Sequence, residues 1–225
     1  MATHLDLQEQ EQLDELKAFW KQYGNPITWV LIAALGGYAA WNGWGWWQRE
    51  QAGKAGAMFD ELDRAAKAGD VEKTARAFAD LKERYPRTAY TGQGGLIAAK
   101  LQAEKAQPDA AVASLTWVAE SASDDAYRSL ARLRLAGVML DQKKYDDALK
   151  QLDAVGKSAE FSALVADRRG DVLAAMGKKD EAKAAYQEAY KALDEKLELR
   201  RFVDAKLTAL GAPPPKADAA SGAAK

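Results

Sequence analysis

Two stretches of this chain resemble each other at a distance of 34 residues, and this repeat constrains the fold more than any other feature. The stretch AGVMLDQKKYDDALKQLDAV begins at residue 136, and GDVLAAMGKKDEAKAAYQEA begins at residue 170. In both, small and large apolar residues recur at the three- and four-residue spacing of helices. A period of this size is typical of helical hairpins, which bury their apolar faces only by stacking on one another. The sequence therefore predicts an all-α solenoid of helical hairpins.

The period and the order of small and large residues resemble the tetratricopeptide repeat. In that motif, small residues lie where two antiparallel helices cross closely, and Gly170, Ala182 and Ala189 occupy these positions here. A large residue fills the space between the two helices, and Tyr186 occupies that position. The resemblance implies a tetratricopeptide-like solenoid.

Weaker copies of the pattern precede this pair at a spacing of 37 residues, so we expect longer links between those hairpins. Thr74 stands where the motif prefers alanine. The predicted hairpins cover residues 55–88, 92–125, 129–162 and 163–196. One further helix, with a stripe of Leu199, Val203, Leu207 and Leu210, should cap the solenoid. The repeat domain would then cover residues 48–211, and the Pro- and Ala-rich residues 212–225 should be disordered.

A second feature is a run without Lys, Arg, Asp or Glu from Gln22 through Gln48. A helix needs about 20 apolar residues to cross the hydrocarbon core of a bilayer. Trp46 and Trp47 precede Arg49, as is typical of rings at a membrane–water boundary. The run is longer than the apolar core of a cleavable signal peptide and follows an acidic segment. We therefore expect a single uncleaved transmembrane helix over residues 26–47.

Residues 1–25 form a separate segment ahead of this run. An apolar helical stripe consists of Leu13, Leu16, Trp20 and Tyr23. Pro26 disfavours helix in the residue before it, so we expect a short amphipathic helix and then a break. The helix could lie on a membrane surface, could dock a cytoplasmic partner, or could be a frayed polar lead-in. The sequence leaves these alternatives open.

Small residues share one face of the expected transmembrane helix. Gly36, Ala40 and Gly43 recur at intervals of four and three residues. Small residues at this spacing allow another membrane helix to approach closely. We therefore predict a docking face for a second transmembrane helix at these positions.

The composition excludes several classes of site. The chain has no cysteine, which removes thiolate nucleophiles, disulfides and Cys-based metal sites. The single histidine, His4, lies outside the repeat domain. After residue 47 the chain has 30 basic and 28 acidic residues, a balance that argues against nucleic acid as a partner. We expect no enzyme activity, no catalytic residues, no metal and no cofactor.

The repeat register predicts which residues face the groove formed by the first helix of each hairpin. These are Gln93, Leu96 and Lys100 from the second hairpin, Leu130, Leu133, Leu140 and Asp141 from the third, and Asp167 and Asp171 from the fourth. Leucines mixed with scattered charges suit a polypeptide partner or client better than a small molecule. Some of these leucines could instead pack against the next hairpin.

The N-terminal sequence carries a more specific resemblance. The lead EQEQLDELKAFWKQYGN, the Gly/Trp-rich run and WWQREQAGKAGAMFDEL resemble the YfgM family, ancillary subunits of the bacterial SecYEG translocon. The resemblance implies a single-pass type II protein of the bacterial inner membrane, with a cytoplasmic N-terminus and a periplasmic repeat domain. The implied partners are the SecYEG translocon, a membrane-anchored periplasmic prolyl isomerase-like chaperone, secretory polypeptide clients and the lipid bilayer.

Orientation is a point on which two arguments disagree. Lys and Arg are more frequent after the run than before it, which by the positive-inside rule places the large domain in the cytoplasm. The resemblance implies the opposite orientation.

The leading functional hypothesis is an adaptor that transfers secreted proteins from the translocon to periplasmic chaperones. One alternative is a regulator that acts on a signalling protein through residues 1–24. Another is a scaffold for envelope assembly that uses the same groove.

Overall fold

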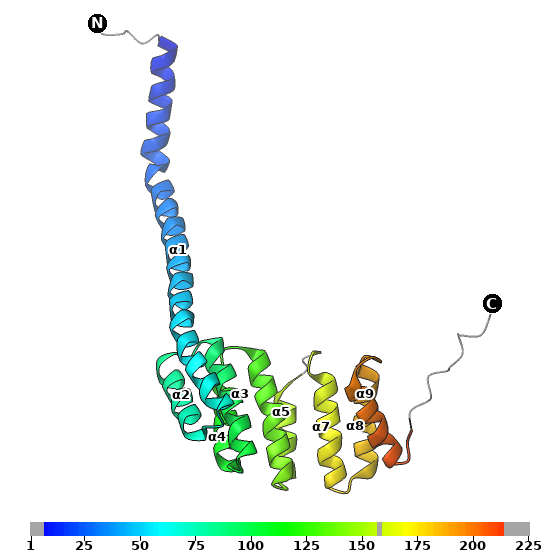
Figure 1. Ribbon diagram of the computed structural model, residues 1–225. Helices are drawn as coiled ribbons and strands as arrows, with labels where there is room; N and C mark the ends of the chain where they lie inside the picture. Colours follow the sequence, from blue (N-terminus) through cyan, green and yellow to red (C-terminus); the bar gives the residue numbers. More distant parts are fainter. Residues whose placement is uncertain (1–6, 157–158, 214–225) are drawn as a thin grey trace, which may run out of the picture. The chain divides into compact units, whose positions relative to one another are not determined.

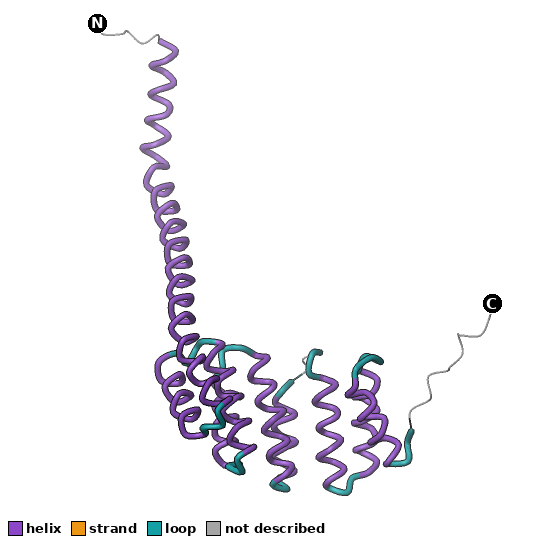
Figure 2. Tube along the Cα trace, in the orientation of Figure 1, coloured by secondary structure: helices purple, strands orange, loops and turns teal. Residues whose placement is uncertain are grey.

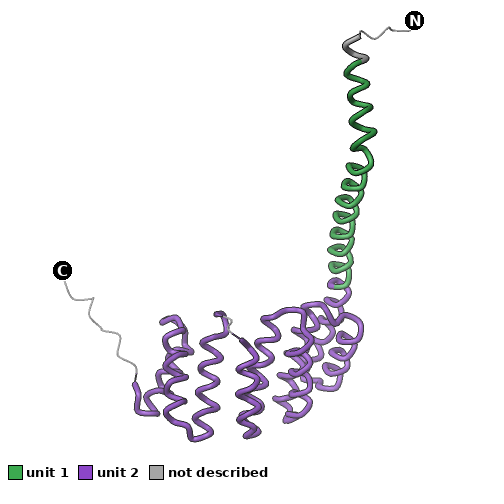
Figure 3. Tube along the Cα trace, turned by 180° about the vertical axis from the view of Figure 1, so that it is seen from behind, with its two compact units in different colours: residues 1–51 green, residues 52–225 purple. Residues whose placement is uncertain are grey.

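The computed structural model describes residues 7–156 and 159–213, and these residues form nine helices (Figure 1). The helices are α1 (Leu7–Lys67), α2 (Val71–Arg84), α3 (Ala89–Glu104), α4 (Pro108–Ser121), α5 (Asp125–Asp141), α6 (Tyr145–Ala154), α7 (Ser162–Ala175), α8 (Lys179–Ala192) and α9 (Glu198–Ala209). The chain divides into two compact units, Met1–Gln51 and Ala52–Lys225 (Figure 3). Most of the tail that we expect to be disordered, residues 214–225, lies outside the described residues.

The second unit consists of consecutive helical hairpins, as the repeat predicts. Ala55 and Leu62 in the last turns of α1 share a hydrophobic cluster with α2, and then α3 pairs with α4, α5 with α6 and α7 with α8 (Figure 2). The all-α repeat architecture is thus confirmed. The expectation of longer links is wrong: residues 85–88 and 122–124 are short loops, and the longest link, 155–161, lies where the period is 34. The extra residues instead lengthen α3 to 16 and α5 to 17 residues, against 14 in α7.

Each hairpin turns at a residue with a positive φ angle. These residues are Gly69 (72°), Ala106 (56°), Lys143 (60°) and Gly177 (78°). In each turn the next amide donates a hydrogen bond to a carbonyl five residues earlier, as Lys144 N does to Met139 O at 2.8 Å. This pattern is a Schellman motif, which satisfies carbonyls that the helix end leaves free. Two of the four turns therefore place a side chain where glycine is the favoured residue.

The hydrophobic core is continuous from hairpin to hairpin. One cluster joins the end of α1 to α2–α5, a second joins α5, α6 and α7, and a third joins α7, α8 and α9. Val203 and Leu207 of α9 are almost completely buried in the third cluster. The last helix thus covers the apolar face that α7 and α8 would otherwise expose, as we expect of a capping helix.

A local hydrogen bond allows a threonine to occupy a small-residue position in the first hairpin. Thr74 is buried, and its hydroxyl donates a 2.7 Å hydrogen bond to the carbonyl of Asp70 one turn earlier. A buried hydroxyl is costly only when it lacks a hydrogen-bond partner. Thr74 therefore occupies the small position without leaving an unsatisfied polar group.

The prediction of a transmembrane anchor over residues 26–47, which lie in α1, is wrong. None of the described helices combines the length and the apolar character that a membrane crossing requires. With 61 residues, α1 is long enough, so its composition is what fails. Glycine, tryptophan and Asn42 dilute the second half of the run from Gln22 through Gln48, although the run carries no formal charge. The lack of charged residues was therefore an insufficient criterion.

The predicted break at Pro26 is also absent, because α1 continues through this residue. Proline removes one backbone donor from a helix without necessarily ending it. Near this point the Thr28 hydroxyl donates a 2.8 Å hydrogen bond to the carbonyl of Gly24. The amphipathic N-terminal segment and the apolar run therefore belong to one helix.

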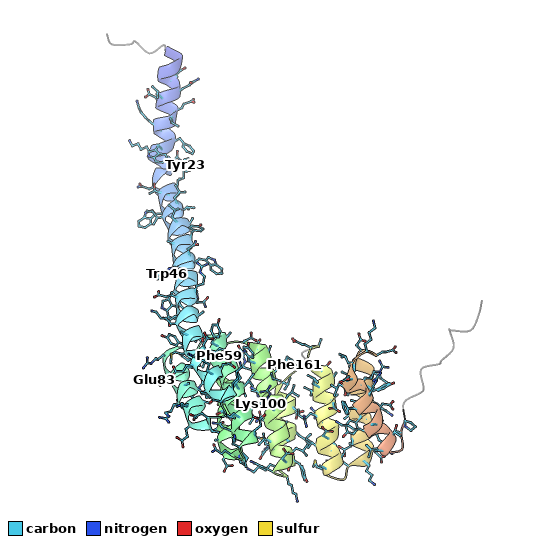
Figure 4. The ribbon with its side chains drawn as sticks, in the orientation of Figure 1. Tyr23, Trp46, Phe59, Glu83, Lys100 and Phe161 are labelled. Carbon is cyan, nitrogen blue, oxygen red and sulfur yellow. The ribbon has the colours of Figure 1, made fainter. Side chains whose placement is uncertain are left out.

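The apolar side chains of the first unit are exposed. Trp41 has 80% of its surface exposed, Trp29 and Tyr38 have 71% each, and Leu35 has 66%. Tyr23 and Trp46 are further examples along the same helix (Figure 4). An apolar surface of this extent is typical of a site that another molecule covers.

Candidate functional site

An open groove of about 550 Å³ lies in the repeat unit, mainly between α3, α5 and α7. The residues that line it are Ala99, Lys100, Ala103, Glu104, Leu115, Leu130, Leu133, Arg134, Gly137, Val138, Asp141, Leu164, Asp167, Arg168 and Leu199. Almost all of them come from the first helix of a hairpin, and Leu199 comes from the capping helix α9. In Figure 1, α3, α5 and α7 follow one another along the repeat unit, and Figure 4 labels Lys100 on α3. The lengthened ends of α3 and α5 contribute Glu104 and Asp141 to the groove.

The central wall of the groove is one face of α5. Arg134, Gly137 and Asp141 follow each other at intervals of three and four residues, so they share this face. The Arg134 guanidinium donates a 3.1 Å hydrogen bond from Nη1 to the carbonyl of Leu96 in α3. More than a third of the Arg134 surface is exposed, and burial of the remainder lowers its pKa. The side chain is thus positioned by α3 and still presents donors to the groove.

Most other charges of the groove are already paired within the repeat unit. Lys100 Nζ lies 3.7 Å from Glu104 Oε1 in α3. On α7, Arg168 Nη1 lies 3.4 Å from Asp171 Oδ2. In the part of the chain that the structure describes, Arg134 and Asp141 have no oppositely charged partner within ion-pair distance. The groove therefore presents one cation and one anion that are not neutralised internally.

A cluster of charged residues lies around Asp167, which lines the groove. Lys206 Nζ lies 2.7 Å from Asp167 Oδ1 and 2.7 Å from Asp171 Oδ1. The Tyr186 hydroxyl donates a 2.9 Å hydrogen bond to Asp171 Oδ1. Burial raises the pKa of Asp167 above its ordinary value, although the hydrogen bond from Lys206 opposes this shift. Burial also raises the pKa of Tyr186. The cluster ties the capping helix to α7 by charge as well as by apolar packing.

Five of the nine predicted groove residues line the groove: Lys100, Leu130, Leu133, Asp141 and Asp167. The other four have different positions. Leu96 is 4% exposed and packs in the first core cluster, and Leu140 packs against the core of α5–α7. Gln93 is partly buried and does not line the groove, and Asp171 holds Lys206. Which of the nine contact a partner stays a prediction.

Sequence reasoning missed several groove residues, above all Arg134, Gly137, Leu164, Arg168 and Leu199. A signal for Arg134 was available, because it lies four residues after Leu130 and seven before Asp141 on the same helical face. No such signal existed for Leu199. Its place in the groove follows from how α9 packs against α7 and α8.

The predicted helix-docking face lies in the first unit. Gly36, Ala40 and Gly43 are exposed, and a Cβ at either glycine would meet no atom of the described chain within 4 Å. The face is therefore accessible on α1. Its role in docking another helix stays a prediction, and the membrane-spanning context that motivated it does not hold.

Comparisons with known proteins agree with the repeat architecture. Residues 17–212 match the family model of a tetratricopeptide repeat-like domain. A protein of Neisseria gonorrhoeae named ancillary SecYEG translocon subunit is 33% identical, over 93% of this chain and 100% of its own length. Proteins of the same name from Haemophilus influenzae and Escherichia coli K12 are 31% and 27% identical, over 81% and 85% of this chain and 89% and 94% of their own lengths.

Proposed function

Because the chain belongs to the tetratricopeptide repeat-like family of ancillary SecYEG translocon subunits, we propose that it is a non-enzymatic adaptor of a bacterial Sec translocon. The observation that carries the proposal is the groove between α3, α5 and α7, which is open, largely apolar and large enough for several side chains of a bound polypeptide. In this proposal residues 48–211 form the binding domain. Its ligands are segments of secretory polypeptides, which it transfers to periplasmic chaperones, including a membrane-anchored prolyl isomerase-like protein.

The first unit has a different role in the proposal. Its exposed aromatic and aliphatic side chains, from Leu13 to Trp47, form the surface through which the chain associates with the inner membrane beside the translocon. Such a surface is unfavourable in water, because each exposed side chain forgoes about 1.5–3 kcal/mol of burial free energy. The repeat unit would act on the periplasmic side of that membrane.

Site-specific photocrosslinking in cells tests the polypeptide-binding role. We would place the crosslinking amino acid at Asp141 and Leu164, both of which line the groove and are exposed to solvent. Ala184, an exposed position of α8 that does not line the groove, serves as the matched control. We expect adducts with translocon subunits, a chaperone or secretory chains at the two groove positions and not at Ala184. Equal yields at all three positions would contradict the role of the groove.

A thiol-labelling experiment tests the compartment of the repeat unit. The chain has no cysteine, so Gln187→Cys on the exposed side of α8 introduces a single reporter. Labelling by a membrane-impermeant maleimide in cells with a permeabilised outer membrane would support the periplasmic location. Labelling only after lysis would place the repeat unit in the cytoplasm, as the Lys and Arg distribution suggests.

A further inference from the structure

We propose that the groove recognises a polypeptide segment by charge as well as by apolar contact, with a carboxylate of the ligand bound to Arg134 and a basic group bound to Asp141. This inference rests on the proposed polypeptide-binding function and names the chemistry of the ligand. The ligand is a mainly apolar segment that carries one acidic and one basic group about 10 Å apart. That distance is the separation of two positions seven residues apart along a helix axis, as Arg134 and Asp141 are on α5.

The charges around the groove differ in whether another residue already neutralises them. Lys100 has Glu104 at 3.7 Å, and the charges around Asp167 neutralise one another through Lys206. A ligand that approached these groups would have to displace an existing partner. Arg134 and Asp141 have no ion-pair partner among the described residues, so a charged group of a ligand can bind there without displacing one.

The geometry of Arg134 suits a carboxylate ligand. Its Nη1 is committed to the carbonyl of Leu96, which holds the guanidinium against α3. A guanidinium has five N–H donors in a planar fork, so the remaining donors suit a carboxylate. Holding the side chain in place before binding also lowers the entropic cost of forming the ion pair.

Gly137 lies between the two charges on the same face of α5. A Cβ at this position would have only Arg168 nearby, with Arg168 Cζ at 3.9 Å. No side chain of α5 itself therefore fills the space between Arg134 and Asp141. The apolar part of a ligand can rest there, with Leu130, Leu133 and Leu164 lining the rest of the groove.

Binding of fluorescent peptides to the purified full-length chain tests the inference. The peptides share one apolar core and have blocked ends; they carry an acidic residue, a basic residue, both or neither. We expect Arg134→Gln to weaken binding of the acidic peptide about tenfold, as for a lost hydrogen bond to a charged group, and to leave the basic peptide unchanged. Asp141→Asn should have the opposite selectivity. A fifth peptide, with a free C-terminal carboxylate as its only acid, shows whether a chain terminus can supply the carboxylate.

The outcomes separate this inference from the function on which it rests. If the peptides bind with one common Kd that neither substitution changes, charge recognition is overturned while polypeptide binding stands. If no peptide binds, including the neutral one, the proposed polypeptide-binding groove itself fails. Thermal unfolding checks that both variants stay folded: Asp141→Asn should keep the midpoint of the parent chain, and Arg134→Gln should lower it only slightly, because the variant loses the hydrogen bond to Leu96 but the side chain belongs to no core cluster.

Discussion

The ring of Tyr186 in α8 lies so close to the backbone of Gly170 in α7 that a Cβ at Gly170 would come within 2.4 Å of Tyr186 Cε1. Tyr186 is only 4% exposed, and its hydroxyl is held by Asp171. The small and large positions of the repeat thus meet directly, and this contact sets the distance between the two helices of the fourth hairpin.

The first prediction is that Gly170→Ala destabilises the chain by about 1–3 kcal/mol, the range for overpacking a well-filled core. The added methyl group forces the Tyr186 ring or the α7 backbone to move. Gly137→Ala is the matched control, since its Cβ would meet only Arg168 at 3.9 Å and alanine favours helix over glycine. Urea unfolding measures both. Equal stabilities of the two variants would show that the Gly170–Tyr186 contact is not tight.

The second prediction concerns the turn between α5 and α6. Lys143 has a φ angle of 60°, which costs a residue with a side chain about 1–2 kcal/mol relative to glycine. Lys143→Gly should therefore raise the thermal unfolding midpoint. Lys143→Ala removes the charge and keeps the Cβ, so it should have little effect. The reciprocal change Gly177→Lys, at φ 78°, should lower the midpoint. If Lys143→Ala raised the thermal unfolding midpoint as much as Lys143→Gly, the charge of Lys143 and not its backbone conformation would be the source of the strain.

The third prediction concerns the capping helix and pH. Lys206→Met leaves Asp167 and Asp171 without the ammonium group that contacts both. The pKa of Asp167 is already raised by burial, and loss of Lys206 should raise it further. When the pKa of a carboxyl is higher in the folded state than in the unfolded state, the folded state becomes less stable as the pH rises from the unfolded pKa toward and beyond the folded pKa, because the buried group must then lose its proton. The variant should therefore lose about 1–3 kcal/mol at pH 7 and less at pH 4.

Urea unfolding at both pH values measures this effect. Lys191→Met is the control, because Lys191 is exposed on α8 and has no ion pair among the described residues. Its stability should match that of the parent chain at either pH. A loss for Lys206→Met that is the same at pH 4 and pH 7 would assign the role of Lys206 to packing of its aliphatic stem.

The fourth prediction is that Gly137→Phe blocks the groove without harming the fold. A Cβ at this position would have Arg168 at 3.9 Å in ordinary van der Waals contact, and glycine in a helix interior is not required for its conformation. Binding of the neutral apolar peptide should weaken about tenfold, which equals about 1.4 kcal/mol. Ala184→Phe adds the same ring to an exposed position of α8 outside the groove and should leave Kd unchanged. Unaltered binding by Gly137→Phe would locate the peptide elsewhere.

Much of the fold could be predicted because the repeat is a local pattern. Ala182, Tyr186 and Ala189 lie within one helix, so their spacing alone predicts which face packs inward, and all three are buried. The extra residues of the 37-residue copies were harder to place. Extra residues can either extend a helix by about one turn or lengthen a loop, and only the helix propensities of those residues favour one outcome over the other. The alanines and leucines near the ends of α3 and α5 favour helix.

The groove could be predicted only in part. Lys100, Leu133 and Asp141 follow from the register of single helices, whereas Leu96 belongs to the core because α2, α4 and α5 pack around α3. The apolar run was misread for a related reason. Absence of charge is visible in a list of residues, but a membrane crossing depends on the summed hydropathy of a whole helical window, which glycine, Asn42 and tryptophan lower.

From the residues alone we could predict the all-α repeat, the positions of its small and large residues and the absence of cysteine chemistry, because each depends on residue type and spacing along the chain. Which charges from distant parts of the chain neutralise one another depends on how the helices pack. Lys206 and Asp167 are 39 residues apart and form an ion pair at 2.7 Å, whereas Arg134 and Asp141 on one helix have no charged partner in the described chain. Local pairs such as Lys100–Glu104 follow from the spacing along one helix, whereas pairs such as Lys206–Asp167 form only when the hairpins stack, because Coulomb attraction depends on distance in space.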